Sequence, residues 1–138
     1  MRKRVQTIGL AVSLFGMAAF GAVKIKSRRP APTTETILGI YHVKEGADDQ
    51  FLKAYRNTWS VYRELDAVFE KPHVLMKGTD ESGRTCYFDL FTWKDAEIPD
   101  HAPDKIKTAW KELEALCESR GGHRGIEGDA VTIVDEAK

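Results

Sequence analysis

Hydrophobic positions after residue 35 change their spacing along the chain at regular intervals. Residues 36–44 (TILGIYHVK) form a short apolar run rich in β-branched side chains, which predicts a buried strand. In residues 47–68, apolar side chains recur every three or four positions, as on one face of a helix. Asp48 and Asp49 favour the helix start, because they lie near the positive end of its dipole. The spacing therefore predicts a strand followed by a long amphipathic helix.

The same change of pattern repeats in the second half of the domain. Residues 73–77 and 84–93 predict two strands, joined by the hairpin sequence GTDESG. A second helix is predicted from about residue 104 and is expected to end at Gly121-Gly122, where glycine can take a positive φ. Residues 130–134 (AVTIV) predict a fourth strand. The order βαββαβ predicts an α+β fold, ferredoxin-like, with an antiparallel four-stranded sheet.

The predicted strands have apolar side chains on both faces, so helices on one face would leave the other uncovered. Strand and helix rises place Cys86 and Cys117 at the same level. If Cys117 faces the sheet, Cys86, Phe88 and Leu90 face the helices. The opposite set is then expected to face a partner subunit or a cavity: Tyr87, Asp89, Phe91 and Trp93. Such an apolar face predicts a homodimer whose two sheets pack together.

The charge distribution divides the chain into two parts. Residues 1–29 contain seven Lys or Arg and no acidic residue, whereas the remainder has 14 basic and 21 acidic residues. An acidic domain is a poor partner for phosphate backbones, so nucleic-acid binding is not expected. The basic and apolar N-terminal segment predicts a signal peptide, with export to the periplasm or the extracellular space, or a membrane anchor through residues 5–23. Residues 30–35 are then a linker, and 36–138 the folded domain.

Three segments carry a resemblance to a known superfamily. They are IYHVKEGADDQFLKAY at the first strand and helix, the aromatic third strand YFDLFTW with the acidic loop after it, and KTAWKELEAL in the second helix. On these segments the domain resembles the dimeric α+β-barrel superfamily, in particular the branch related to the antibiotic-biosynthesis monooxygenases. The resemblance implies two ferredoxin-like sheets packed face to face, with a ligand cavity beside each sheet.

Asp89 is the first candidate catalytic residue, because it stands in the middle of an aromatic strand. An unpaired carboxylate on such a face is costly and its pKa rises; alternatively, Asp89 pairs with a basic residue of a neighbouring strand such as Lys77. His42 and His101 are the other catalytic candidates, since only histidine titrates near neutrality and His101 follows a loop near the third strand. The candidate substrate-binding residues are aromatic: Tyr41, Tyr87, Phe91 and Trp93.

The other histidines and the cysteines point to no further site. His73 and His123, at a strand start and in a glycine-rich turn, are expected to be solvated. Cys86 and Cys117 are expected to be buried free thiols, with a disulfide as the alternative if the domain is exported. Because no Cys or His group has the spacing of a zinc site, no metal is expected.

These residues favour binding of a small apolar or aromatic molecule. Through the resemblance, the leading enzymatic hypothesis is a cofactor-independent monooxygenase acting on an aromatic or quinol-like substrate, whose own carbanion reacts with oxygen. The alternative is a non-catalytic ligand-binding or structural dimerisation module. Haem binding is the third candidate: Trp93 and His101 match the Trp and His of the haem-degrading members, but ILGIYHV lacks their asparagine.

Overall fold

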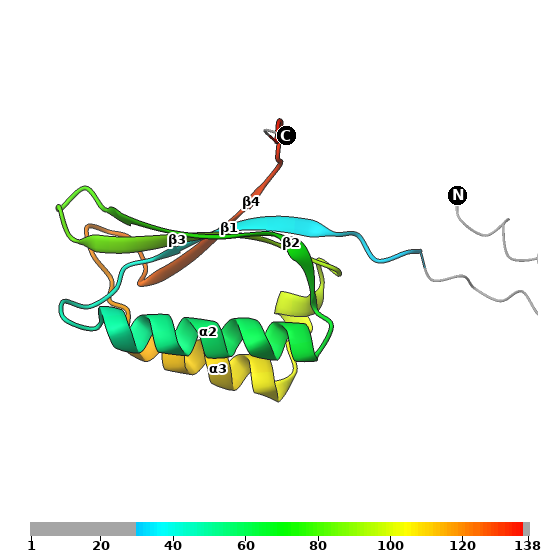
Figure 1. Cartoon of the computed structure of the whole chain (residues 1–138), viewed down its shortest axis with the longest axis horizontal. Coiled ribbons are helices and arrows are strands. Elements are labelled where there is room, and N and C mark those ends of the chain that lie inside the picture. The colour runs from blue at the N-terminus through cyan, green and yellow to red at the C-terminus, as the bar shows by residue number, and fades with distance from the viewer. Residues whose placement is uncertain (1–29, 137–138) are drawn as a thin grey trace, which may run out of the picture. The chain divides into compact units, whose positions relative to one another are not determined.

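A computed structural model describes residues 30–136 of the chain. Within this range the elements are β1 (Glu35–Tyr41), α2 (Asp48–Glu64), β2 (Val68–Thr79), β3 (Thr85–Trp93), the 3₁₀ helix η1 (Ile98–His101), α3 (Asp104–Ala115) and β4 (Ile126–Val131). The strands form one antiparallel sheet in the order β2-β3-β1-β4, and α2 and α3 lie on one face of it (Figure 1). The predicted ferredoxin-like α+β arrangement is therefore confirmed.

Both helices end earlier than predicted. α2 ends at Glu64 rather than near residue 68, because Asp66 takes a positive φ of 54° and turns the chain toward β2. α3 ends at Ala115, well before the glycine pair, and Cys117 forms a bridge with Val43 beside the sheet. The glycines therefore belong to the loop that follows α3 and do not end the helix.

The second and fourth strands also have different limits. β2 is longer than the predicted 73–77, since its pairing with β3 includes Val68 and resumes at His73 after a shift in register. β4 begins upstream of the predicted 130–134, because its pairing with β1 starts where Ile126 lies opposite Tyr41. β3 agrees with the prediction to within one residue.

The helix-facing side of the sheet holds the hydrophobic core. The ring of Phe51 on α2 lies 5.2 Å from that of Tyr41 on β1 and 4.7 Å from that of Tyr87 on β3. Further along α2, the Tyr62 ring lies 4.8 Å from Trp93. These aromatic side chains are all buried, so they exclude water from the layer between sheet and helices.

The predicted orientation of β3 was wrong. Its buried residues Tyr87, Asp89, Phe91 and Trp93 face the helices, and the alternate residues, including Phe88 and Leu90, face away from them. Cys117 lies beyond the end of α3 and packs in the core, whereas Cys86 alternates with Tyr87 and lies on the other side of the sheet. Two cysteines at one level can thus lie on opposite faces.

The side of the sheet away from the helices, called the open face below, is apolar at its centre. Its side chains form two rows across β2, β3 and β1: Val74, Leu90 and Leu38 in one, and Met76, Phe88 and Ile40 in the other. Val74 and Met76 are 45% and 46% exposed. No helix of residues 30–136 covers this face (Figure 1). A second apolar face was therefore predicted correctly, but with the wrong residues.

The N-terminal targeting segment predicted for residues 1–29 lies outside the described residues and stays a prediction. Residues 30–34, where a linker was expected, are exposed and form neither helix nor strand. Among the described residues, no helix is both long and apolar enough to cross a membrane.

Replacing Phe51 with Ala should lower the free energy of unfolding by about 3–5 kcal/mol, because a fully buried ring between two strands is lost. Glu112→Ala, on an exposed position of α3, should change it by less than about 0.5 kcal/mol. Chemical denaturation of both variants measures the difference. Equal stabilities would contradict the position of α2 over the sheet.

Candidate functional site

Asp89 lies in the middle of β3, 1% exposed, under the helices. It stands opposite Gly39 on β1 and Leu75 on β2. A Cβ atom at Gly39 would overlap Asp89 Oδ1, so the carboxylate occupies the space that any other residue at position 39 would fill. Glycine at this position therefore allows a carboxylate to fit inside an aromatic core.

The carboxylate of Asp89 has one direct hydrogen bond and one free oxygen. The Tyr41 hydroxyl donates to Oδ2 at 3.2 Å, while Oδ1 accepts no hydrogen bond from the described residues. Burial raises the pKa of Asp89 to about 6, although the nearby hydroxyls of Tyr55 and Tyr41 partly oppose this. A group with this pKa is partly protonated near neutral pH and can exchange protons there.

The alternative in which Lys77 neutralises Asp89 is wrong. The ammonium group of Lys77 lies 2.9 Å from Asp48 Oδ2, and the Tyr87 hydroxyl donates to the same oxygen at 2.8 Å. These two contacts, Lys77 first, lower the pKa of Asp48. Lys77 is thus paired with Asp48 at the start of α2, and Asp89 has no ion-pair partner among the residues described.

His73 lies between this buried group and the surface. It was expected to be solvated, and its contacts in the core were not predicted. Its Nε2 atom is hydrogen-bonded to the Tyr55 hydroxyl at 2.9 Å, and its ring stacks on Trp59 with centroids 3.5 Å apart. Burial, together with the charge of Arg63, lowers the pKa of His73. Tyr55, whose hydroxyl lies near Asp89, and half-buried His73 therefore lead from the core toward the sheet edge.

A cleft of about 320 Å³ lies beside Gly39, on the helix-facing side of β1 and β4. It is lined by five aromatic residues, together with Gly39 and the acidic residues Glu35 and Glu127: Tyr41, Tyr62, Phe91, Trp93 and Trp110. The Trp110 indole donates to the Tyr62 hydroxyl at 2.5 Å, which links α3 to α2 at this point. Tyr41 is the shared element, since it lines the cleft and also donates to Asp89.

The structure brings some of the predicted site residues together and separates others. Asp89, Tyr41, Phe91 and Trp93 lie at or beside the cleft. Tyr87 does not line it, because its ring packs on Phe51 and its hydroxyl reaches Asp48. Sequence reasoning did not identify Tyr62 or Trp110 as cleft residues, although the apolar spacing placed both on the inward stripes of the helices.

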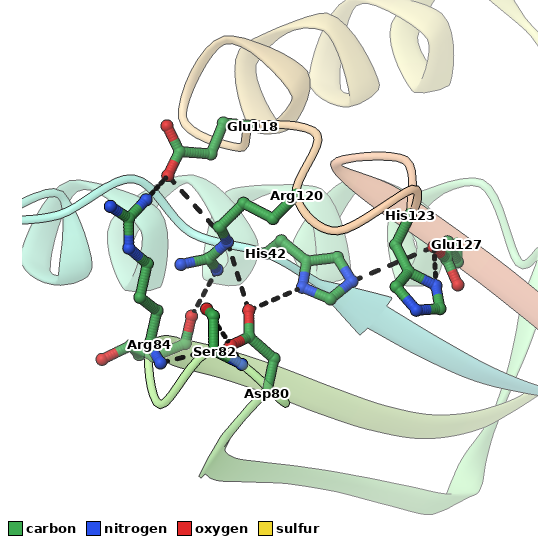
Figure 2. A network of polar contacts seen from close by, with 9 residues as sticks. His42, Asp80, Ser82, Arg84, Glu118, Arg120, His123 and Glu127 are labelled. Carbon is green, nitrogen blue, oxygen red and sulfur yellow. Dashed lines mark hydrogen bonds and ion pairs between the residues drawn. The ribbon is translucent and has the colours of Figure 1, made fainter.

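The two other catalytic candidates do not join Asp89. His101 is exposed at the end of η1. His42 follows Tyr41 directly and therefore points to the opposite side of β1, where it contacts Asp80, Glu127 and His123 (Figure 2). A second pocket, of about 240 Å³, lies there.

Both cysteines are buried free thiols, as predicted, and the alternative disulfide is not formed. Cys86 lines the second pocket with His42, and Cys117 packs in the core beside Val43 and Leu113. The two thiols therefore lie in different environments on different sides of the sheet.

No protein-family model matches the sequence, and no curated protein is similar to it in sequence. Solved structures do share its architecture. SnoaB, described as a cofactor-independent oxygenase from Streptomyces nogalater, has a TM-score of 0.55 at 17% identity, over 75% of this chain and 95% of that one. A structure described as an antibiotic biosynthesis monooxygenase has a TM-score of 0.53 at 14% identity, over 75% and 100%.

A dimeric ferredoxin-like protein of unknown function from Jannaschia sp. CCS1 has a TM-score of 0.53 at 23% identity, over 73% of this chain and 100% of that one. The chain has the ferredoxin-like fold of these proteins. At such identities the likeness concerns the fold, and at this level the predicted resemblance to the antibiotic-biosynthesis-monooxygenase branch is confirmed.

The raised pKa of Asp89 predicts a pH dependence of stability. Between its usual pKa of 3.8 and about 6, the folded state holds a proton that the unfolded state has lost, so the free energy of unfolding falls as pH rises through this window. Asp89→Asn removes the effect. From pH 4 to pH 7 the stability difference should shift in favour of the variant by about 2 kcal/mol.

Urea denaturation across this pH range measures the shift. Asp129→Asn, at an exposed position of β4, is the matched control and should leave the pH dependence unchanged. Parallel profiles for wild type and Asp89→Asn would mean that the carboxylate is solvated.

Proposed function

We propose that this protein binds a small, flat, hydroxylated aromatic or quinol-like molecule in the cleft and oxidises it with molecular oxygen, without a cofactor. The observation that carries the proposal is the free, buried oxygen Oδ1 of Asp89, on a carboxyl whose pKa is about 6, beside an aromatic cleft. A substrate hydroxyl is a natural donor to such an oxygen, because an unpaired buried acceptor is costly.

The cleft supports this class of substrate. Its volume lies at the lower end of the roughly 300–1,000 Å³ typical of ligand pockets, which limits the ligand to a small molecule. Rings of Tyr62, Phe91, Trp93 and Trp110 offer faces and edges for aromatic packing. Tyr41 adds a hydroxyl at the side nearest Asp89.

In the proposed reaction Asp89 acts as the general base. It takes the proton from a substrate hydroxyl, and the resulting anion places electron density on a ring carbon that bonds to oxygen. With hydroquinone, one oxygen atom replaces a ring hydrogen and the other leaves as water, so that hydroquinone and O₂ give hydroxyquinone and H₂O. Tyr55 and His73 offer a path by which the proton on Asp89 leaves the core.

The fold shared with SnoaB, described as a cofactor-independent oxygenase, agrees with this chemistry. The alternative of a non-catalytic binder uses the same cleft without oxygen transfer. An oxygenase, a non-catalytic binder and a haem-binding protein respond differently to hydroquinone and to haemin.

Oxygen consumption by the full chain with hydroquinone tests the activity. We expect enzyme-dependent formation of hydroxyquinone, identified by mass spectrometry, whereas autoxidation gives quinone and hydrogen peroxide. Asp89→Asn should slow the reaction by at least about 100-fold, because general-base catalysis contributes roughly 10²–10⁴-fold. Glu112→Gln, an exposed carboxylate replacement on α3, should react like the wild type.

Other outcomes decide against the oxygenase. Saturable quenching of tryptophan fluorescence by hydroquinone without product would favour the non-catalytic binder. A Soret shift on addition of haemin, at one haem per chain, would favour haem binding. An undiminished rate in Asp89→Asn would exclude Asp89 as the base.

We also propose that two copies pair through their open faces. The two rows of apolar side chains across β2, β3 and β1 form a continuous patch of the kind that monomers seldom expose. A two-fold axis through the patch would let it cover itself. The dimeric ferredoxin-like protein of the same fold supports this assembly.

Met76→Asp should therefore dissociate the homodimer, because it would bury a carboxylate in an apolar interface while leaving the core intact. Sedimentation at micromolar concentration measures the oligomeric state, with Glu112→Ala as the control that keeps it. A soluble monomeric wild type would rule out pairing through the open face.

A further inference from the structure

His42, His123 and Glu127 form a compact group on the side of β1 opposite the cleft (Figure 2). They come from the chain just after β1, from the loop after α3, and from β4. One potential ligand atom from each lies within 4.8 Å of the other two. Glu127 Oε1 is 3.0 Å from His123 Nδ1 and 3.9 Å from His42 Nε2, and the two imidazole rings stack at 5.7 Å.

Asp80 fixes the orientation of His42 from behind. Its Oδ2 atom lies 3.3 Å from His42 Nδ1 and 3.2 Å from the Nε atom of Arg120. The other oxygen of Asp80, Oδ1, accepts hydrogen bonds from the Ser82 side chain and from the backbone N–H groups of Ser82 and Arg84, which fix the carboxylate in place. A carboxylate accepts, so in a neutral His42 the Nδ1 atom donates to Asp80 and Nε2 presents a lone pair.

That lone pair has no hydrogen-bond partner within residues 30–136, although His42 is only 5% exposed. A buried acceptor without a partner costs free energy and calls for an explanation. Nε2 points toward the carboxylate of Glu127, which is an acceptor too and cannot satisfy it when ionised (Figure 2). A cation between the two would satisfy both.

We propose that His42, His123 and Glu127 bind a divalent transition-metal ion, of which Zn²⁺ is the best match. Two imidazoles and one carboxylate are a common three-ligand set for zinc, and the hydrogen bond from the first imidazole to Asp80 is the usual support of a ligating histidine. His42 and His123 take no part in the proposed oxygenase activity, since they lie on the other side of the sheet from Asp89, whereas Glu127 on the edge strand β4 lines both the pocket and the cleft.

The geometry requires only small adjustments. Metal–ligand distances of about 2.0–2.1 Å place tetrahedral ligand atoms roughly 3.3 Å apart, closer than the present maximum separation. The side chains of His123 and Glu127 are 49% and 25% exposed and can move, while His42 is held by Asp80. The 240 Å³ pocket lies at the edge of the open face, where Ile40 and Phe88 also line it, and leaves room for a fourth ligand.

Neighbouring charges do not oppose the ion. Arg120 is the nearest buried cation, and it is paired with Asp80 at 3.2 Å and lies 3.9 Å from Glu118 (Figure 2). Its guanidinium also donates to the Thr85 carbonyl at 2.7 Å. Asp80 and Glu118 therefore balance the positive charge of Arg120, which weakens its repulsion of an ion held by the three ligands.

Calorimetric titration of Zn²⁺ into the tag-free, chelator-treated full chain tests the site. We expect one Zn²⁺ per chain, and with Co²⁺ the strong visible absorption of a four-coordinate ion. His123→Ala and Glu127→Gln should each weaken Zn²⁺ binding by at least about 100-fold, and Asp80→Asn by about 10–100-fold, as for loss of a supporting carboxylate. His101→Ala, at an exposed histidine of η1, is the matched control and should bind like the wild type.

His123 and Glu127 are partly exposed, so these variants test the ligands without emptying the core; circular dichroism checks that they fold. Absence of saturable Zn²⁺ binding, or equal affinity in His123→Ala and wild type, would overturn the proposal. In that case the group is a structural network in which Glu127 pairs with His123 alone.

Discussion

One constraint shapes the whole domain: its sheet has two apolar faces, and the helices of the described chain cover only one of them. On the covered side the aromatic layer excludes water, and Asp89 is buried there with no ion-pair partner in residues 30–136. On the other side the apolar rows need a partner of their own kind. The cleft chemistry and the proposed assembly are thus separate consequences of the same two-faced sheet.

The order of the elements could be predicted from the sequence, because apolar spacing distinguishes strands from helices over short windows. The orientation of β3 could not. Alternation shows that Tyr87 and Phe88 lie on opposite faces, but not which face the helices cover, and here both sets are apolar. The height of Cys86 and Cys117 along the sheet says nothing about the side of the sheet on which each lies. Larger aromatic rings on one set would have been the better guide, since they bury more area.

Part of the site was also accessible from sequence. The rise in the pKa of Asp89 followed from its apolar neighbours, and that reasoning holds although the face was misassigned. The contacts of His73 and His42 depend on strand register and on the loop after α3, which bring together residues from distant segments. No local pattern in the sequence contains this information. His73 was therefore expected to be solvated, and the partners of His42 were not predicted.

Tyr41 and His42 are adjacent in the chain and serve opposite sides of the sheet: the first contacts Asp89, and the second contacts Asp80. Inserting or deleting one residue in β1 would turn each side chain to the other face of the sheet and break both contacts at once. Length variation among related chains should therefore be purged from β1.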